Sequence, residues 1–193
     1  MTMTNANNGP LAGIKVLEFG SALTAPWAAG ILCDQGAEVI KIEPPGIGDV
    51  MRFIGSNRNG ITVPFQVANR GKKSLVLDIK QEKGAAIALA LAAEADVIIH
   101  NMRPGVMERR GLGYEDCHAR NSDIVYCAIS GYGHKGPMAG KPAYDNVIQA
   151  FTGICWAQAD LDTGEPVQVY QLFADKLTAI TAAQSICAAL VAR

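Results

Sequence analysis

The chain has 193 residues, 49% of them apolar and 18% charged, which is the size and composition of one globular domain with a sizeable core. Its 17 basic and 18 acidic residues give a formal net charge of −1, so overall charge provides no attraction to nucleic acid or to an anionic membrane. The five cysteines form no CxxC pair, and together with a polar start unlike a secretory leader they favour reduced thiols in a cytoplasmic protein.

Apolar, strand-like stretches alternate with helical stretches along the chain. Residues 13–19 have the pattern of a buried strand, and a helix is predicted from Pro26 to Gly36, because proline suits a first helical turn and glycine a helix end. Residues 46–64 are rich in Gly and Asn and are predicted to be a loop. Further strands are predicted over 37–43, 74–79, 96–101 and 123–130, and further helices over 81–95, 104–111, 143–153 and 175–192.

Strands separated by helices predict an α/β fold in which a mostly parallel sheet is flanked by helices. In such sheets ligands bind beyond the carboxyl ends of the strands. The loops predicted at that edge are residues 20–26, 43–50, 101–105 and 131–142. Residues 1–10 are polar and are predicted to be a disordered tail, and residues 11–193 are predicted to be one domain. Because the chain stops inside an apolar helix, we expect this domain to be truncated at its C-terminus.

Patterns typical of other protein classes are weak. The longest apolar runs, residues 84–93 and 177–192, are shorter than the roughly 20 residues of a membrane span, so no membrane association is predicted. The three histidines lack the spacing of a metal site, and no metal is expected. Residues 131–136, GYGHKG, match the pattern GxGxxG but follow the fifth strand. A dinucleotide-binding loop follows the first strand and opens a helix, so a dehydrogenase is disfavoured.

Basic side chains gather in two loops. One contains Arg70, Lys72 and Lys73, and the other, residues 100–111, contains Arg109 among its arginines. Each loop is either a solvated turn or part of a clamp for phosphate groups, because Arg and Lys both bind phosphates. Two such loops at one edge of a sheet would suit a ligand that carries several phosphates.

Asp175 is the one acid in QLFADKLTAI, residues 171–180, and it precedes a long apolar run. An aspartate at a helix start is most often an N-cap, because its oxygens accept hydrogen bonds from free backbone N–H groups. The same place also holds a carboxylate ionised and oriented, as a nucleophile requires. The local sequence leaves both interpretations open.

Six blocks, taken together and in this order, resemble the class III coenzyme A transferases, the CaiB/BaiF family. They read LAGIKVLEFGSALTAPWAAGILCDQGAEVIKIEPPGIGD, NRGKKSLVLDIK, ADVIIHNMRPGVMERRGLGYE, AISGYGHKGP, YDNVIQAFTG and LFADKLTAITAAQSICAAL. They extend over nearly the whole chain from Leu11 on, and several blocks in one order are far more specific than a single loop. The resemblance implies that this chain is the N-terminal portion of a Rossmann-like large domain, and that the protein is a homodimer of interlocked rings.

The resemblance also implies a reaction. The acid in the segment that matches LFADK is the family's nucleophile, so Asp175 would attack an acyl-CoA, and an aspartyl-CoA thioester would then pass coenzyme A to a carboxylic acid. Asp175 would be both helix cap and nucleophile. The family's contacts with coenzyme A map by position onto seven residues: Leu23, Thr24, Leu77, Lys80, Asn101, Met102 and Arg109. Arg70, Lys72 and Lys73 lie close enough in the sequence to help.

Two other functions remain as alternatives. Racemases of the same family act on 2-methylacyl-CoA and pair the same acid with a histidine, but Tyr144 stands at that position. Tyrosine is a poor base near neutral pH, because its unperturbed pKa is about 10, and the transferase is therefore favoured. The second alternative is a non-catalytic fragment that binds coenzyme A without turnover, since relatives continue beyond the point at which this chain stops.

Overall fold

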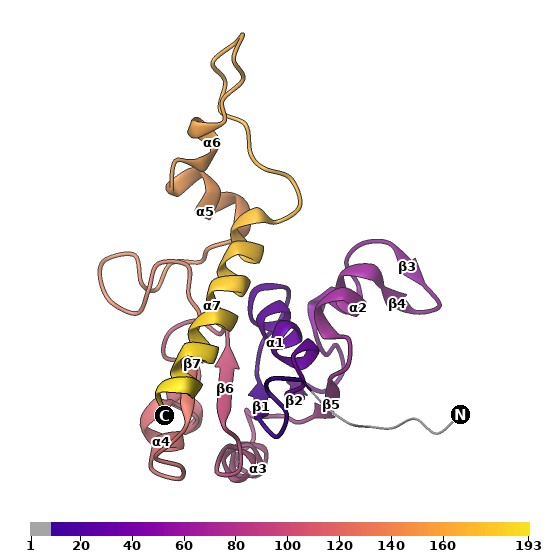
Figure 1. The fold of residues 1–193 in the computed structure, drawn as a ribbon, viewed down its shortest axis with the longest axis vertical. Coiled ribbons are helices and arrows are strands. Elements are labelled where there is room, and N and C mark those ends of the chain that lie inside the picture. The colour runs from indigo at the N-terminus through magenta and orange to yellow at the C-terminus, as the bar shows by residue number, and fades with distance from the viewer. Residues whose placement is uncertain (1–8) are drawn as a thin grey trace.

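The computed structural model describes residues 9–193, and its centre is a five-stranded sheet in the order β5-β2-β1-β6-β7 (Figure 1). The strands are β1 (Lys15–Glu18), β2 (Glu38–Glu43), β5 (Lys73–Val76), β6 (Val97–His100) and β7 (Val125–Ala128). All neighbouring strands run parallel. When the five strands are numbered along the chain, their order in the sheet is 3-2-1-4-5. This is the order of a Rossmann-type doubly wound sheet, in which the direction of winding reverses between the first strand and the fourth. The predicted α/β fold with a parallel sheet is confirmed.

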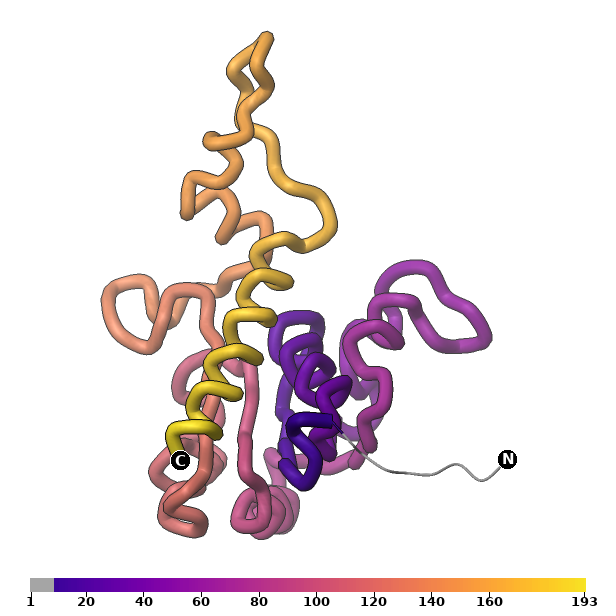
Figure 2. The backbone as a smooth tube through the Cα atoms, in the orientation of Figure 1, coloured from indigo at the N-terminus to yellow at the C-terminus, as the bar shows by residue number. Residues whose placement is uncertain are grey.

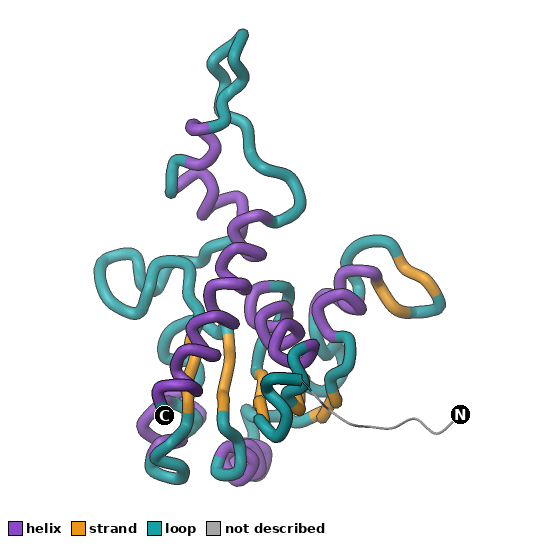
Figure 3. The backbone as a smooth tube through the Cα atoms, in the orientation of Figure 1, coloured by secondary structure: helices purple, strands orange, loops and turns teal. Residues whose placement is uncertain are grey.

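Helices connect the strands. The described helices are α1 (Thr24–Asp34), α2 (Val63–Asn69), α3 (Glu82–Ala92), α4 (Tyr114–His118), α5 (Asp145–Phe151), α6 (Ile154–Ala157) and α7 (Phe173–Ala192), with the 3₁₀ turns η1 (Val50–Arg52) and η2 (Glu108–Arg110). A small antiparallel hairpin of β3 (Asn57–Arg58) and β4 (Ile61–Thr62) lies outside the main sheet (Figure 3).

The central strands of the sheet are covered on both faces, which explains why they carry apolar side chains toward both. Val16 and Ile99 pack on one face against alanines of α1 and α7, whereas Leu17 and Ile98 pack on the other face against α3. Successive side chains of a strand point to opposite faces, so each strand serves both cores. The facing sides of α1 and α7 are lined by buried alanines, and these small side chains let the two helices pack closely.

The direction of α7 sets the position of the site. Residues 143–172, with α5 and α6, project beyond the carboxyl ends of the strands, and α7 then returns along the sheet in the opposite direction to the strands (Figures 1 and 2). The first turn of α7 therefore lies at the carboxyl edge of the sheet, where ligands of doubly wound folds bind.

The predicted loop over residues 46–64 is wrong in part, because this stretch contains η1, the β3–β4 hairpin and the start of α2. These elements form an arm that projects to one side of the sheet (Figure 1). Asn59 and Gly60 both have positive φ, 54° and 82°, as the turn of a two-residue hairpin requires. The Asn-Gly pair was thus a signal for a hairpin rather than for irregular structure.

Several predicted boundaries also change. The first helix begins at Thr24 rather than Pro26, and the last begins at Phe173 rather than at residue 175. The helix predicted over 104–111 is a turn followed by η2, and α4 and α6 were not predicted. Of the predicted tail, residues 1–8 lie outside the described residues. Gly9 belongs to a turn in which its carbonyl accepts a hydrogen bond from the N–H of Ala12 (3.0 Å).

Candidate functional site at the carboxyl edge of the sheet

The loops that follow β1 and β6 meet at the point where the strand order reverses, which is the usual ligand position in this fold. Asn101, directly after β6, binds the backbone of Ser21 twice. The Ser21 N–H donates to Asn101 Oδ1 (3.0 Å), and Asn101 Nδ2 donates to the Ser21 carbonyl (2.8 Å). This pair of hydrogen bonds ties the two loops together and fixes the floor of the site.

Asp175 occupies the third position of α7, not its N-cap. The N-cap residue is Leu172, which has a left-handed φ of 57° and makes no side-chain cap. The backbone N–H of Asp175 donates instead to Asp145 Oδ1 (3.0 Å). The prediction that Asp175 caps the helix is therefore wrong: an acid from another helix accepts its N–H, and the Asp175 carboxylate is left free to point elsewhere.

The Asp175 carboxylate faces the start of α1. The Thr24 hydroxyl donates a hydrogen bond of 2.6 Å to Asp175 Oδ1, and no ion pair among the described residues includes Asp175. Burial raises the pKa of Asp175 above its ordinary value, the Thr24 hydrogen bond opposes this rise, and the nearby Asp145 charge adds to it. The carboxylate thus lies in the first turn of a helix, whose dipole favours negative charge, without a neutralising partner.

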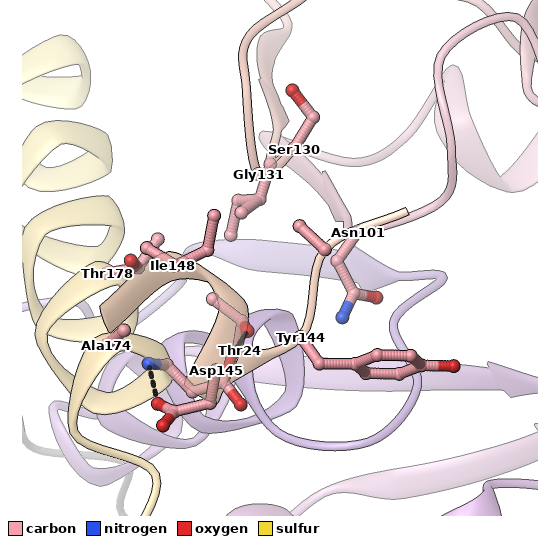
Figure 4. Close-up of a pocket in the computed structure, with 12 residues that line it drawn as sticks. Thr24, Asn101, Ser130, Gly131, Tyr144, Asp145, Ile148, Ala174 and Thr178 are labelled. Atoms are coloured by element: carbon pink, nitrogen blue, oxygen red, sulfur yellow. Dashed lines mark hydrogen bonds between the residues drawn. The ribbon is translucent and has the colours of Figure 1, made fainter. Parts of the chain in front are cut away.

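Asp145 holds the segments around Asp175 in place. It is the first residue of α5 and is buried, and its Oδ2 accepts a hydrogen bond from Gln149 Nε2 (2.5 Å). Gln149 also donates to the carbonyl of Val169 (2.9 Å) and accepts from its N–H (2.8 Å). Figure 4 shows Thr24, Asp145 and Ala174 gathered at the start of α7, with the ring of Tyr144 extending away from them.

Two adjoining hollows open beside Asp175. Their volumes are about 150 and about 230 Å³, and Asp175, Thr24 and Asn101 line both. The larger hollow brings together five of the eight predicted site residues: Leu23, Thr24, Asn101, Met102 and Asp175. Two cations, Arg103 and Lys141, also line it. The site therefore combines one unpaired carboxylate with cationic side chains along the wall.

The other three predicted residues follow strands or turns on the same side of the sheet but do not line these hollows. Leu77 comes directly after β5, and its side chain packs against the core on the α3 face. Lys80 is exposed in the turn before α3. Arg109 is exposed in η2, after the β6 loop.

The three basic residues around the start of β5 are all held in ion pairs. Arg70 pairs with Asp34, and Lys73 pairs with Glu38. The Lys72 ammonium is buried, 2.7 Å from Glu18 Oε2. The expectation that Lys72 helps to bind phosphates is wrong, because its ammonium is buried against Glu18, and Arg70 and Lys73 each already have a carboxylate partner at the surface.

Several lining residues were missed by sequence reasoning. Ser130 and Gly131 follow β7 and line both hollows, as does Tyr144, whose side chain is 75% exposed. The loop 131–142 was predicted to lie at the binding edge, so its position was a usable signal. Asp145 was missed as well, although an acid at the start of a predicted helix could have drawn attention.

Over residues 9–193, no group of three or more His, Cys, Asp or Glu side chains is arranged to hold a metal ion. In the same range, none of the helices combines the length and apolar character needed to cross a membrane.

Residues 11–193 match the family model of CoA-transferase family III. The acetyl-CoA:oxalate CoA-transferase of Acetobacter aceti is 43% identical over 161 residues, which are 83% of this chain and 41% of that enzyme. The human succinyl-CoA:glutarate CoA-transferase is 39% identical over 186 residues, which are 96% of this chain and 42% of that enzyme. This chain thus spans less than half the length of either relative.

Solved structures show the same fold. A CAIB/BAIF family protein from Brucella suis superimposes with a TM-score of 0.91 at 39% identity, over 96% of this chain and 50% of that one. The protein Rv3272 from Mycobacterium tuberculosis superimposes with a TM-score of 0.87 at 36% identity, over 95% of this chain and 51% of that one.

Proposed function

Because the chain belongs to CoA-transferase family III, we propose that it transfers coenzyme A from an acyl-CoA to a small carboxylic acid, and that Asp175 is the nucleophile. The observation that carries this proposal is the environment of Asp175. Its carboxylate accepts one hydrogen bond, from Thr24, and borders two hollows that together extend from α7 to the loop after β6. An acid used only for structure would be paired or fully hydrogen-bonded.

The reaction exchanges one thioester for another through Asp175. Its carboxylate attacks the donor thioester carbonyl, the C–S bond breaks, and a mixed anhydride and coenzyme A thiolate result. The thiolate attacks the Asp175 carbonyl, which releases the donor acid and leaves an aspartyl-CoA thioester. The acceptor carboxylate then attacks the aspartyl-CoA thioester, which releases coenzyme A thiolate and forms a second mixed anhydride. The thiolate attacks the acceptor carbonyl of this anhydride, so the new acyl-CoA forms and the carboxylate of Asp175 is regenerated. Thioester energy is conserved because no step uses water.

The residues around Asp175 divide this work. The Thr24 hydroxyl, held at 2.6 Å, orients the carboxylate and helps to keep it ionised, since a donor favours the charged form. Lys80 and Arg109 would contact phosphates of coenzyme A, with Leu23, Leu77, Asn101 and Met102 along its path. A second copy of the chain as partner and a cytoplasmic location complete the proposal.

The acceptor is a carboxylic acid in this proposal, and its identity is left open. The relatives carry names that include oxalate and glutarate, which are dicarboxylates. Arg103 and Lys141 on the wall of the larger hollow provide cations that would suit an anionic substrate group. The racemase alternative lacks a comparable feature, because the residue beside Asp145 is the exposed Tyr144.

The proposal is tested by trapping the intermediate. The protein in its natural length is incubated with acetyl-CoA or succinyl-CoA and quenched with hydroxylamine, and its peptides are mapped by mass spectrometry. We expect a hydroxamate on the peptide that contains Asp175, and no such mass in Asp175→Asn. An adduct on another acidic residue, or the absence of any adduct while transfer proceeds, would refute the proposal that Asp175 is the nucleophile. Exchange of the C2 proton of a 2-methylacyl-CoA in heavy water would instead support the racemase.

A further inference from the structure

A cluster of four buried charges lies beneath the loop that connects β1 and α1. Lys41 Nζ is 2.7 Å from Glu18 Oε1 and 2.8 Å from Asp49 Oδ2, and Lys72 Nζ is 2.7 Å from Glu18 Oε2. The four side chains are at most 2% exposed. Two acids and two bases alternate, so the cluster has no net charge. Its charges are balanced within the cluster itself, without a bound substrate.

Such a cluster calls for a role other than stability. Removing charges from water costs free energy that their mutual attraction rarely exceeds, and a buried pair is often no better than well-packed apolar residues. Buried ionic groups are better explained where they select one conformation. The Lys41 ammonium donates to the Gly20 carbonyl (2.9 Å), and the Lys72 ammonium donates to the Pro26 carbonyl (2.6 Å). The cluster therefore holds both ends of the same loop.

Asp49 also contacts the middle of the loop. While its Oδ2 faces Lys41, its Oδ1 accepts hydrogen bonds from the N–H of Ala22 (3.0 Å) and from the Ser21 hydroxyl (3.3 Å). The same oxygen accepts from the N–H of Met51 (2.9 Å), in the first turn of the arm. One carboxylate thus joins the loop, the buried cluster and the base of the arm.

Ala22 has an unusual backbone conformation. Its φ is 64°, in the left-handed region that residues with a Cβ rarely adopt. Strained residues of this kind persist where their surroundings hold them, and they cluster at functional sites. Ala22 lines the larger hollow, and it stands two residues before Thr24, whose hydroxyl contacts Asp175.

We propose that Asp49 is a positioning residue of the site: it holds Ala22 in the left-handed conformation and so sets the Thr24 hydroxyl against Asp175. Asn101 holds the loop from the side of β6, and Asp49 holds it from the side of β2. The effect on turnover rests on the proposed transferase function, whereas the effect on the loop does not. Asp49 itself lies outside both hollows beside Asp175.

The effect on the loop is measured without ligand, by amide hydrogen exchange of the protein. We expect Asp49→Ala to speed exchange of the amides in residues 21–24 by about tenfold or more, because the fixed loop then opens locally. Asn121→Ala is the control. It removes a half-buried hydrogen bond to the Ala95 carbonyl (2.8 Å) at the amino edge of the sheet and should leave these amides unchanged. Unchanged exchange in Asp49→Ala would refute the proposal, as would an equal rise in both variants.

The effect on the site is measured with a double-mutant cycle of Asp49→Ala and Ala22→Gly. Glycine adopts a left-handed φ without steric cost, so the loop then needs less support. We expect Asp49→Ala to lower kcat/KM for acyl-CoA by about tenfold alone and by no more than about threefold beside Ala22→Gly. Additive losses would refute positioning through Ala22. If the unchanged protein transfers no coenzyme A, the proposed function fails, and the exchange experiment still decides the role of Asp49 in the loop.

Discussion

Asp49 and Asp175 contact the same loop, residues 21–24, at different residues and in different states of pairing. Asp49 is 1% exposed and meets Lys41 and three hydrogen-bond donors. Asp175 is half-buried, accepts one hydrogen bond from Thr24 and borders two hollows. A buried carboxylate that contacts an ammonium and several donors fixes a geometry, whereas one with few partners keeps oxygens available for a reaction. The same residue type is thus held by its contacts at one position and is available for the proposed chemistry at the other.

The largest expected effect separates these two acids. Asp175→Asn should lower turnover on the order of 10⁴-fold, the usual scale for loss of a nucleophile, because an amide cannot attack a thioester. Its shape and its place in the first helical turn are kept, so the free energy of unfolding should change by about 1 kcal/mol or less. Steady-state transfer kinetics and denaturant unfolding measure the two quantities.

Asp49→Asn is the matched control for this experiment, and it should reverse the pattern. Its turnover should fall far less than that of Asp175→Asn. Its free energy of unfolding should fall by more, up to about 3 kcal/mol, because the buried Lys41 loses one of its two charge partners. Similar profiles for the two variants would break the comparison, because both acids would then be structural or both catalytic.

The next effect concerns the one hydrogen bond that Asp175 accepts from a side chain. Thr24→Val removes the hydroxyl, and burial and the charge of Asp145 then act unopposed, so the pKa of Asp175 should rise further. Since attack needs the ionised carboxylate, the acid limb of the kcat/KM profile should move to higher pH, with a loss of about tenfold below it. Thr24→Ser keeps the donor and should retain the original profile. If the pH profiles of kcat/KM for Thr24→Val and for the unchanged protein coincide, Thr24 does not influence the ionisation of Asp175.

The smallest effect tests which basic side chains reach the ligand. Lys80 is exposed without an ion pair among the described residues, whereas Lys73 pairs with Glu38. Lys80→Ala or Arg109→Ala should weaken binding of coenzyme A by about threefold, the scale of an exposed ionic contact, and should leave binding of pantetheine unchanged. Lys73→Ala should alter neither. Equal losses for both ligands in calorimetry would contradict phosphate contacts at Lys80 and Arg109.

The apolar strands and the edge at which the site lies were predictable from the sequence. A strand that is buried on both faces is rich in apolar side chains, as Val97, Ile98 and Ile99 of β6 are, and a parallel sheet then presents its loops at one edge. Asp175 was also singled out early, because a lone acid before an apolar helix needs a reason. The strands and the edge could be predicted because burial acts on each short segment by itself, whereas the local sequence left the role of Asp175 open.

The functions of the charged loops and of the cap were not predictable in this way. The sequence around Lys72 looks like a phosphate loop, but its ammonium meets Glu18, 54 residues away. The N–H of Asp175 is satisfied by Asp145, 30 residues away. The packing of strands and helices brings such partners together, and the residues adjacent in the sequence do not indicate which partner that is.

The sequence by itself thus determined the alternation of strands and helices, the edge of the sheet at which a ligand would bind, and the acid that merits attention there. Only the tertiary structure decided that Asp145 and not Asp175 satisfies the helix N–H, that Lys72 is buried among acids, and that Asp49 holds the loop at Ala22. The physical reason is range. Hydrophobic burial leaves a pattern in every segment, whereas hydrogen bonds and ion pairs act only over a few ångströms between groups that folding brings together.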